Sequence, residues 1–406
     1  MNIETPTMLN PLEPVLAVDP YPTYAGLRGT DPVHQSAIGA WALTRYEDVA
    51  TMLGDTDTYQ HQYVTQQKVR SGPDVEDEAY MDYFRRMVSV MDDPDHRRIR
   101  KLLMQAFTNR TVKSMRDQAS HITNTLIDQQ LAQGGMDLVK DFAYPLPMRI
   151  IGAILGLPEE DYDVIGGHAT ALNPVLEFLP MAPDVLARAN DAINILADYF
   201  RVLADKRRAD PTDDLFSAMV HASEDGERLT SDELIANAIL LYVAGHETTA
   251  AGLSLAVLSL HRNPDQLALL QAQPELRANA IEELFRYDTP GQATARVATK
   301  DVVIGDRALP AGSIVLGYIG AANRDPLAFP DPNSLDITRD FSKLPRPLTF
   351  GGGGHLCLGR QLALQEMDVA LETLMTRCPD MTLETLDPDF RPTPLMRGLA
   401  SLQVRW

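Results

Sequence analysis

A ten-residue stretch near the C-terminal end, FGGGGHLCLG at residues 350–359, constrains the fold more than any other feature of the chain. Glycine permits backbone conformations and close approaches that other residues forbid, so a flat and bulky group can lie directly against such a loop. Cys357 stands where an amphipathic helix is expected to begin, and the positive end of a helix dipole favours a thiolate. Such a thiolate is a good ligand for a soft metal ion, and on haem iron it pushes electron density onto bound oxygen.

This stretch resembles the haem-binding loop of the cytochrome P-450 family, the haem-thiolate monooxygenases. All six positions that define that loop are present: Phe350, Gly351, Gly353, His355, Cys357 and Gly359. The resemblance implies haem b (iron protoporphyrin IX) bound through the Cys357 thiolate, with Phe350, Gly351 and Gly359 around it. The alternative is a glycine-rich turn with a buried structural cysteine, because free cysteines often behave as small apolar residues. Other segments extend the resemblance from residues 19–28 to the C-terminal tail.

Composition predicts a globular protein without a disulfide framework. The chain is 45% hydrophobic and has only two cysteines, of which Cys378 is expected to be a small buried residue. The formal net charge of −20 argues against nucleic acid and anionic membranes as partners. The N-terminal segment has neither a basic n-region nor a long apolar run, so we expect a cytoplasmic monomer without a membrane anchor.

Hydrophobic periodicity predicts a mainly α-helical protein with small β-sheets. Helices are expected at 95–132, 145–156, 159–172, 184–208, 213–223 and 232–261, the last with a Thr230–Glu233 capping box, and again after Cys357. Short strands are expected at 38–44 and within 295–325, and a closing hairpin at 395–406, whereas 60–92 and 326–349 look irregular. The chain contains no linker or repeat, so we expect one domain over residues 1–406 with no fused reductase. The resemblance implies a triangular helical prism, with the haem between the long central helix and the helix after the cysteine.

The middle of the long helix carries the sequence AGHETT at residues 244–249. Ala244 and Gly245 are small enough to let a ligand approach the backbone, and Thr248 can hydrogen-bond back to the Ala244 carbonyl. Glu247 beside Thr248 makes an acid–alcohol pair that can pass protons through water. The resemblance implies that Ala244 contacts the haem, and that Glu247 and Thr248 deliver protons during oxygen activation. By itself the pattern also fits a polar notch in a buried helix.

Two further motifs carry the resemblance. Glu283 and Arg286 are three apart on one helix face and can pair, as in the family's Glu-x-x-Arg motif, and Arg339 occupies the position that completes that network. We assign these residues a structural role. The helix that begins at Asp95 places His96 and Arg100 on one face. The resemblance implies that these two bind the anionic haem propionates together with the following pair: Arg296 and His355. Each of these four also fits a solvated basic residue.

A second set of basic residues near the same helix can stay outside: Arg97, Arg98, Lys101, Lys113 and Arg116. The resemblance places this helix on the cysteine side of the haem. We therefore hypothesise a docking surface for an acidic electron donor such as a ferredoxin, itself reduced by a reductase, because opposite charges speed encounter. The alternative is an ordinary solvated helix face.

Substrate identity is only weakly encoded. By position in the family, the pocket draws on residues 60–92, on Ala244 and on this set: Leu240, Val243, Gln292, Thr294, Leu395 and Met396. These side chains are mostly apolar, which suits a hydrophobic small molecule. The aromatic residues of 60–92 favour a bulky substrate of secondary metabolism, such as a polyketide, terpenoid or cyclic peptide.

The sequence therefore predicts a monooxygenase that inserts one atom of O2 into its substrate by hydroxylation or epoxidation. A peroxygenase or an oxidative coupling enzyme on the same fold is an alternative, although neither needs the Glu247–Thr248 pair. A haem gas sensor or electron carrier is a further alternative from another class. A zinc hydrolase is disfavoured, because the sequence has no His, Cys, Asp and Glu cluster at metal-ligand spacing.

Overall fold

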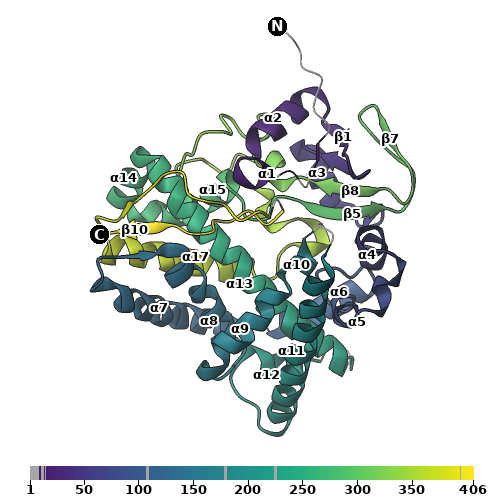
Figure 1. Ribbon diagram of the computed structural model, residues 1–406, viewed down its shortest axis with the longest axis horizontal. Helices are drawn as coiled ribbons and strands as arrows, with labels where there is room; N and C mark the ends of the chain where they lie inside the picture. The colour runs from purple at the N-terminus through teal and green to yellow at the C-terminus, as the bar shows by residue number, and fades with distance from the viewer. Residues whose placement is uncertain are drawn as a thin grey trace.

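The computed structural model describes residues 9–10, 13, 15–106, 109–177, 181–223, 226–393 and 395–406, without the side chains of residues 109–114. Helices form most of it (Figure 1). The α-helices are α1 (Val15–Val18), α2 (Tyr21–Thr30), α3 (Tyr46–Gly54), α4 (Tyr63–Ser71), α5 (Ala79–Phe84), α6 (Asp95–Ala106), α7 (Asn109–Leu131), α8 (Pro145–Ile154), α9 (Tyr162–Ala171), α10 (Asn173–Leu176), α11 (Pro183–Ala209), α12 (Leu215–His221), α13 (Ser231–Arg262), α14 (Pro264–Ala272), α15 (Arg277–Tyr287), α16 (Ile319–Ala322) and α17 (Arg360–Arg377). Short helical turns include η1 (Pro73–Asp77), η5 (Leu348–Phe350) and η6 (Gly353–His355).

The strands are short and gather in small sheets. A five-stranded sheet has the order β1 (Val33–Gln35), β2 (Trp41–Leu43), β8 (Ile314–Gly317), β5 (Thr294–Ala298) and β3 (Tyr59–Gln60), with only the β2–β8 pair parallel. A second sheet joins β4 (Gly135–Asp137), β10 (Gln403–Arg405) and β9 (Thr382–Leu383), and a third pairs β6 (Val302–Ile304) with β7 (Arg307–Leu309). The mainly α-helical class with small sheets is therefore confirmed.

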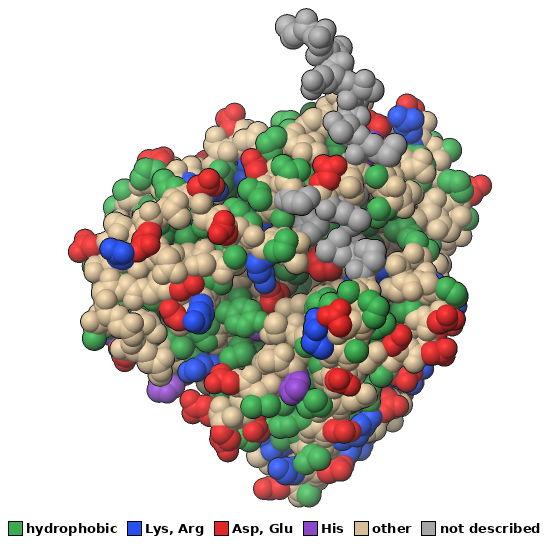
Figure 2. All heavy atoms as spheres, viewed as in Figure 1, with side chains coloured by type: hydrophobic (Ala, Val, Ile, Leu, Met, Phe, Trp, Pro, Cys, Tyr) green, Lys and Arg blue, Asp and Glu red, His purple; other side chains and the backbone are tan. Residues whose placement is uncertain are grey.

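Helix α13 is the central element and passes through the middle of the molecule (Figure 1). It begins with the predicted capping box, in which Thr230 Oγ1 accepts from the Glu233 amide at 3.3 Å and Glu233 accepts from the Thr230 amide at 2.8 Å. Helix α13 is buried around most of its circumference, because α8, α11, α15 and α17 pack against it. Acidic side chains are spread over the face of the molecule that Figure 2 shows, in keeping with the net charge of −20.

Three local predictions were wrong. Residues 60–92 are largely helical rather than irregular, since α4, η1 and α5 lie there and Tyr80 and Phe84 are buried in the core. The segment 95–132 forms two helices, α6 and α7, instead of one. The tail does not close on itself as a hairpin at 395–406, because β10 pairs with β4 and β9. In each case distant contacts decided the local structure, which a periodicity argument cannot include.

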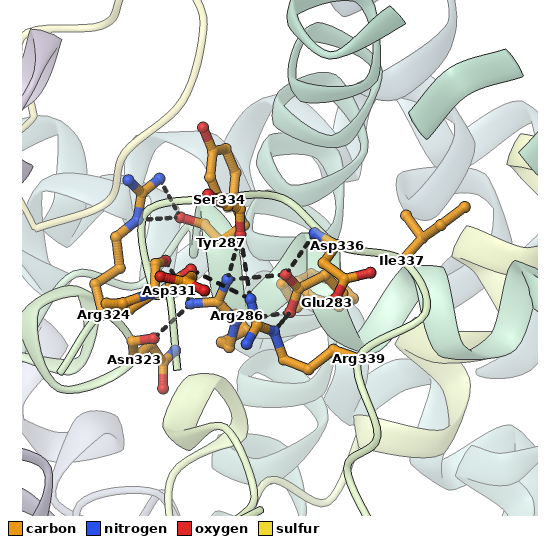
Figure 3. Close-up of polar contacts among 12 residues, drawn as sticks. Glu283, Arg286, Tyr287, Asn323, Arg324, Asp331, Ser334, Asp336, Ile337 and Arg339 are labelled. Atoms are coloured by element: carbon orange, nitrogen blue, oxygen red, sulfur yellow. Dashed lines mark hydrogen bonds and ion pairs between the residues drawn. The ribbon is translucent and has the colours of Figure 1, made fainter. Parts of the chain in front are cut away.

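The predicted Glu283–Arg286–Arg339 network is present and buried (Figure 3). Arg286 donates from Nε and Nη2 to the two Glu283 carboxylate oxygens at 2.6 and 2.8 Å, and Arg339 Nε donates to Glu283 Oε2 at 3.0 Å. The side chains of Glu283 and Arg286 are 0% exposed. Arg286 Nη1 also donates to the carbonyl oxygens of Asn323 and Pro332, each at 2.8 Å. The network thus ties α15 to the long segment between α16 and η5.

The same segment connects the network to the glycine-rich stretch. The Asn323 side chain accepts from the Leu348 amide at 2.7 Å and donates to Thr349 Oγ1 at 2.9 Å. Thr349 Oγ1 in turn donates to the Phe285 carbonyl of α15 at 2.8 Å. The turn η5, which leads directly into the loop that carries Cys357, is therefore positioned by the same group of contacts.

We expect Arg286→Leu to lower the free energy of unfolding by about 3–5 kcal/mol, because it leaves the buried Glu283 carboxylate short of its bidentate partner. Urea unfolding followed by circular dichroism measures this loss. Arg188→Leu is the matched control, since it breaks an exposed ion pair with Asp184 and should cost less than about 1 kcal/mol. Equal losses in the two variants would contradict a structural role for the network.

Candidate functional site

The glycine-rich loop adopts conformations that require glycine at two positions. Gly351 and Gly353 have φ values of +72° and +58°, in the left-handed region. A Cβ atom at Gly353 would lie 2.3 Å from the Leu53 carbonyl oxygen, so any side chain there would collide with backbone. The loop closes through the Cys357 amide, which donates to the Phe350 carbonyl at 2.9 Å. The expected tight loop around the cysteine is therefore formed.

Cys357 lies just before α17, which begins at Arg360. Its side chain is accessible, yet protein atoms surround it closely enough for burial to raise the pKa of the thiol. Backbone N–H groups of Gly359 and Arg360 and the positive charge of Arg100 oppose that rise in pKa. These N–H groups are the ones expected to support a thiolate at a helix start. Cys378, by contrast, is buried as predicted.

An opening interrupts the otherwise buried surface of α13. Ala244 is exposed, and Gly245 and Thr248 are partly exposed, although the residues before and after them are buried. Thr248 Oγ1 donates to the Ala244 carbonyl at 2.8 Å, which is the back-bond predicted from the sequence. Small side chains and this bond leave the middle of the central helix open to a ligand.

Glu247 does not share the open face of Thr248, because two polar partners hold its carboxylate. Arg391, from the C-terminal segment, forms an ion pair with Glu247 Oε1. Asn173 Nδ2, from α10, donates to Glu247 Oε2 at 2.9 Å. Arg391 reaches this position across Gly398, where a Cβ atom would lie 2.3 Å from the guanidinium. Sequence analysis missed Arg391 and Asn173, since neither belongs to a motif or neighbours Glu247 in the chain.

Basic side chains from four separate segments converge beside the loop. The His96 and His355 rings stack with centroids 3.8 Å apart, and the His61 ring lies 4.4 Å from His355. Arg296 of β5 is 3% exposed, and burial lowers its pKa to about 10. Arg100 Nη2 donates to the Leu356 carbonyl at 2.6 Å, one residue before the cysteine. The structure thus brings together the four predicted anion-binding residues and adds His61, which the sequence did not indicate.

Electrostatics in this cluster favours an anionic ligand. Burial and the neighbouring cations lower the pKa of His355 to about 3 and move the pKa of His61 well below its ordinary value. Within the described residues, His61 Nε2 and His96 Nε2 are buried atoms without a hydrogen-bond partner. Buried polar atoms normally have partners, so a group outside the chain is expected to satisfy them.

The predicted pocket residues come from three elements. Leu240 and Val243 lie on α13 and are mostly buried, Thr294 begins β5, and the Leu395 carbonyl accepts from the Gln292 amide at 2.8 Å. Met396 forms a bridge with Gly291. Gln292 itself is 0% exposed, and its side-chain oxygen lies 2.2 Å from where a Cβ atom on Gly320 would be. Gln292 is therefore packed against Gly320 and does not expose its side chain to a ligand.

Two of the basic residues predicted to form a surface near α6 are engaged in ion pairs. Arg98 forms an ion pair with Glu233 at the start of α13, and Arg116 pairs with Asp368 and Glu372 of α17. Arg97 remains 81% exposed, although it contacts Asp93 at 2.6 Å, and Lys101 is exposed. The side chain of Lys113 lies outside the described residues. Arg98 was expected to remain outside; its side chain is 28% exposed, and the Glu233 carboxylate of α13 offsets its charge.

An accessible cysteine in a glycine loop at a helix start, together with a small-residue opening in the central helix, is the combination expected of a haem-thiolate oxygenase. The family model for cytochrome P450 matches residues 172–399. Putative cytochrome P450 133B1 of Xylella fastidiosa is 38% identical over 392 residues, which is 96% of each chain. The 6-deoxyerythronolide B hydroxylase of Saccharopolyspora erythraea is 37% identical over 401 residues, again 96% of each chain. The crystal structure of P450BioI in complex with hexadec-9Z-enoic acid ligated acyl carrier protein is 34% identical, with a TM-score of 0.88 over 97% of this chain and 99% of that chain.

The chain belongs to the cytochrome P450 family. It is an oxidoreductase of the monooxygenase type with bacterial relatives, and the family's cofactor is haem bound through a thiolate. The residues present fit that group: the Cys357 side chain is accessible in its loop, and the two orphaned imidazole nitrogens lie near Arg100 and Arg296, whose charges suit its carboxylates. Among the helices of the described part, none is long and apolar enough to cross a membrane.

Proposed function

We propose that this chain binds haem b through Cys357 and inserts one oxygen atom from O2 into a hydrophobic small molecule, by hydroxylation or epoxidation. The observation that carries the proposal is the accessible Cys357 side chain, held in a glycine loop at the start of α17 beside the buried Arg296 and a group of stacked imidazoles. Bound haem would supply the oxygen-activating chemistry.

Each of the following residues has a proposed role in holding that haem. The Cys357 sulfur ligates the iron, and the backbone N–H groups after it stabilise the thiolate. Phe350, Gly351 and Gly359 shape the loop against the porphyrin, and Ala244 leaves space on the opposite side. The propionates are bound by the predicted cationic set: His96, Arg100, Arg296 and His355. Charge-assisted hydrogen bonds from such donors are roughly twice as strong as neutral ones.

Replacing the ligand tests the proposal directly. We expect the reduced, carbon monoxide-bound protein to absorb at the wavelength for which the family is named, and Cys357→Ser to lose that band because the thiolate is gone. Cys378→Ser is the matched control and should keep the band, since Cys378 is 1% exposed at the far end of α17. A wild-type protein without porphyrin, or a Cys357→Ser variant with an unchanged band, would refute the assignment.

Glu247 and Thr248 are proposed to deliver protons to the oxygen-binding side. Thr248 presents its hydroxyl in the opening of α13, whereas Glu247 is held by Arg391 and Asn173. An arginine partner favours the ionised form of a carboxylate, so Glu247 must loosen that pair or take up a proton before it can donate one. The ion pair therefore makes proton delivery depend on the C-terminal segment, which also carries Leu395 and Met396 of the proposed pocket.

We expect Glu247→Gln to lower kcat for O2-driven product formation by about a hundredfold, because loss of a general acid typically costs 10²–10⁴. The measurement uses a compound selected by its shift of the iron spin state. Turnover driven by hydrogen peroxide should change little, since peroxide brings its own protons. Glu384→Gln, which alters an exposed ion pair with Arg405, is the control. Unchanged O2-driven turnover would exclude the relay, and peroxide-driven turnover that outpaces it in the wild type would favour the peroxygenase alternative.

The substrate is proposed to be a hydrophobic compound of secondary metabolism. Four of the proposed pocket residues are apolar: Leu240, Val243, Leu395 and Met396. Thr294 adds a polar side chain, and Gln292 is fully buried next to them. A relative's name, 6-deoxyerythronolide B hydroxylase, supports a polyketide among the first compounds to screen. Tyr80, Tyr83 and Phe84 are buried in the core, so the aromatic content of 60–92 gives less support for a bulky substrate than the sequence suggested.

Electrons are proposed to come from an acidic ferredoxin-type donor that docks on α6 near Arg97 and Lys101. This face lies on the cysteine side, because Arg100 of the same helix contacts the Leu356 carbonyl. Attraction between an acidic donor and a local basic surface would raise the association rate of two otherwise negative proteins.

We expect the pair of substitutions Arg97→Glu and Lys101→Glu to slow reduction by a plant-type [2Fe–2S] ferredoxin several-fold at low salt, and to flatten the dependence on salt. Stopped-flow formation of the carbon monoxide complex measures the rate. The control pair Lys300→Glu and Arg405→Glu makes the same change in net charge on other exposed positions. If both pairs slow reduction equally, α6 is not a specific docking surface.

A further inference from the structure

We propose that His61 is an additional cofactor-binding residue, which donates a hydrogen bond from Nε2 to a haem propionate. The inference rests on the proposed function and extends it beyond the four residues of the predicted set. His61 is the residue after β3 and is 9% exposed, with its ring against His355. It reaches the cluster from a segment that the sequence analysis treated as part of the substrate pocket.

The backbone around His61 is held in place by two side chains. The Asp92 carboxylate accepts from the His61 amide at 2.7 Å and from the Gln62 amide at 2.9 Å. Gln66 Nε2 donates to the His61 carbonyl at 2.5 Å. Gln62 has a φ of +39°, a left-handed conformation that costs a non-glycine residue about 1–3 kcal/mol and persists only where its surroundings fix it. This turn directs the His61 ring toward His355 and away from solvent.

The His61 ring lacks a partner for a buried polar atom. In the described part of the chain, nothing hydrogen-bonds to Nε2. The nearby carboxylates are engaged elsewhere, since Asp92 binds two backbone amides and Asp93 contacts Arg97 and His96. A buried donor left without an acceptor costs roughly 1–3 kcal/mol, so an external acceptor is expected.

The charges around His61 indicate which kind of acceptor group fits there. The buried guanidinium of Arg296 places a positive charge near His61, so a cation is disfavoured and a carboxylate is favoured. No group of three or more His, Cys, Asp or Glu side chains suited to a metal ion occurs among the described residues. The haem edge is the carboxylate source that fits, because His355 lies in the same loop as Cys357 and the His61 ring packs on His355.

The test measures haem loss, not activity. His61→Phe keeps an aromatic ring but removes the donor, and His61→Ala is a second variant that cannot clash. With native haem we expect both to lose haem to excess apomyoglobin roughly ten- to a hundredfold faster than the wild type. With haem dimethyl ester, whose propionates cannot accept as carboxylates, we expect the variants and the wild type to lose haem at nearly equal rates. His61→Gln places an amide donor at similar reach and should restore slow loss of native haem.

Several outcomes would overturn the proposal. Unchanged loss of native haem in both His61→Phe and His61→Ala would mean that His61 makes no such bond. Faster loss of both haems to the same extent would assign His61 a packing role only. Exposed His121 provides the control, since His121→Phe should change neither rate. Failure of the broader function is separable, because it would appear as a wild-type protein without the reduced carbon monoxide band.

Discussion

The buried guanidinium of Arg286 is the contact on which the rest of the site depends. It is fully buried and donates to both oxygens of Glu283 and to three backbone carbonyls, so its charge is satisfied only if α15 and the segment between α16 and η5 keep their positions. The Asn323 side chain hydrogen-bonds to Leu348 and Thr349, which directly precede the glycine loop. The cysteine is therefore positioned by packing and ion pairs that lie well away from it.

Charge is distributed unevenly in this acidic protein, and the distribution follows the proposed chemistry. Arg100 of α6 and Arg296 of β5 bring positive charge next to three imidazoles whose pKa values are lowered, and two of the imidazole nitrogens have no partner among the described residues. An anion placed there would pair with the guanidinium groups and accept from the imidazoles. On α13 the arrangement is reversed, since the Glu247 carboxylate is already neutralised by Arg391. One region is thus prepared for an external anion, and the other holds its own ion pair.

Prediction from the sequence succeeded where the relevant contacts are local. The Thr230–Glu233 capping box, the Thr248 back-bond and the Glu283–Arg286 pair each join residues within four positions on one helix, so spacing alone is sufficient. It could not show that Arg98 pairs with Glu233 of α13, and it failed for the helices of 60–92, among which α5 packs on α11 and α13. Arg391, Asn173 and His61 were missed for the same reason, because none stands near its partner in the chain.

The sequence by itself determined the cysteine loop, the open centre of the long helix and the mainly helical class, since glycine conformations, small side chains and periodicity act over a few residues. Only the tertiary structure decided which charges are paired and which await a ligand. Arg391 meets Glu247 across 144 positions of the chain, and the His61 ring contacts that of His355 although the two residues lie far apart in the sequence. Electrostatic partners are chosen by distance in space within a medium of low polarity, and no linear pattern encodes that distance.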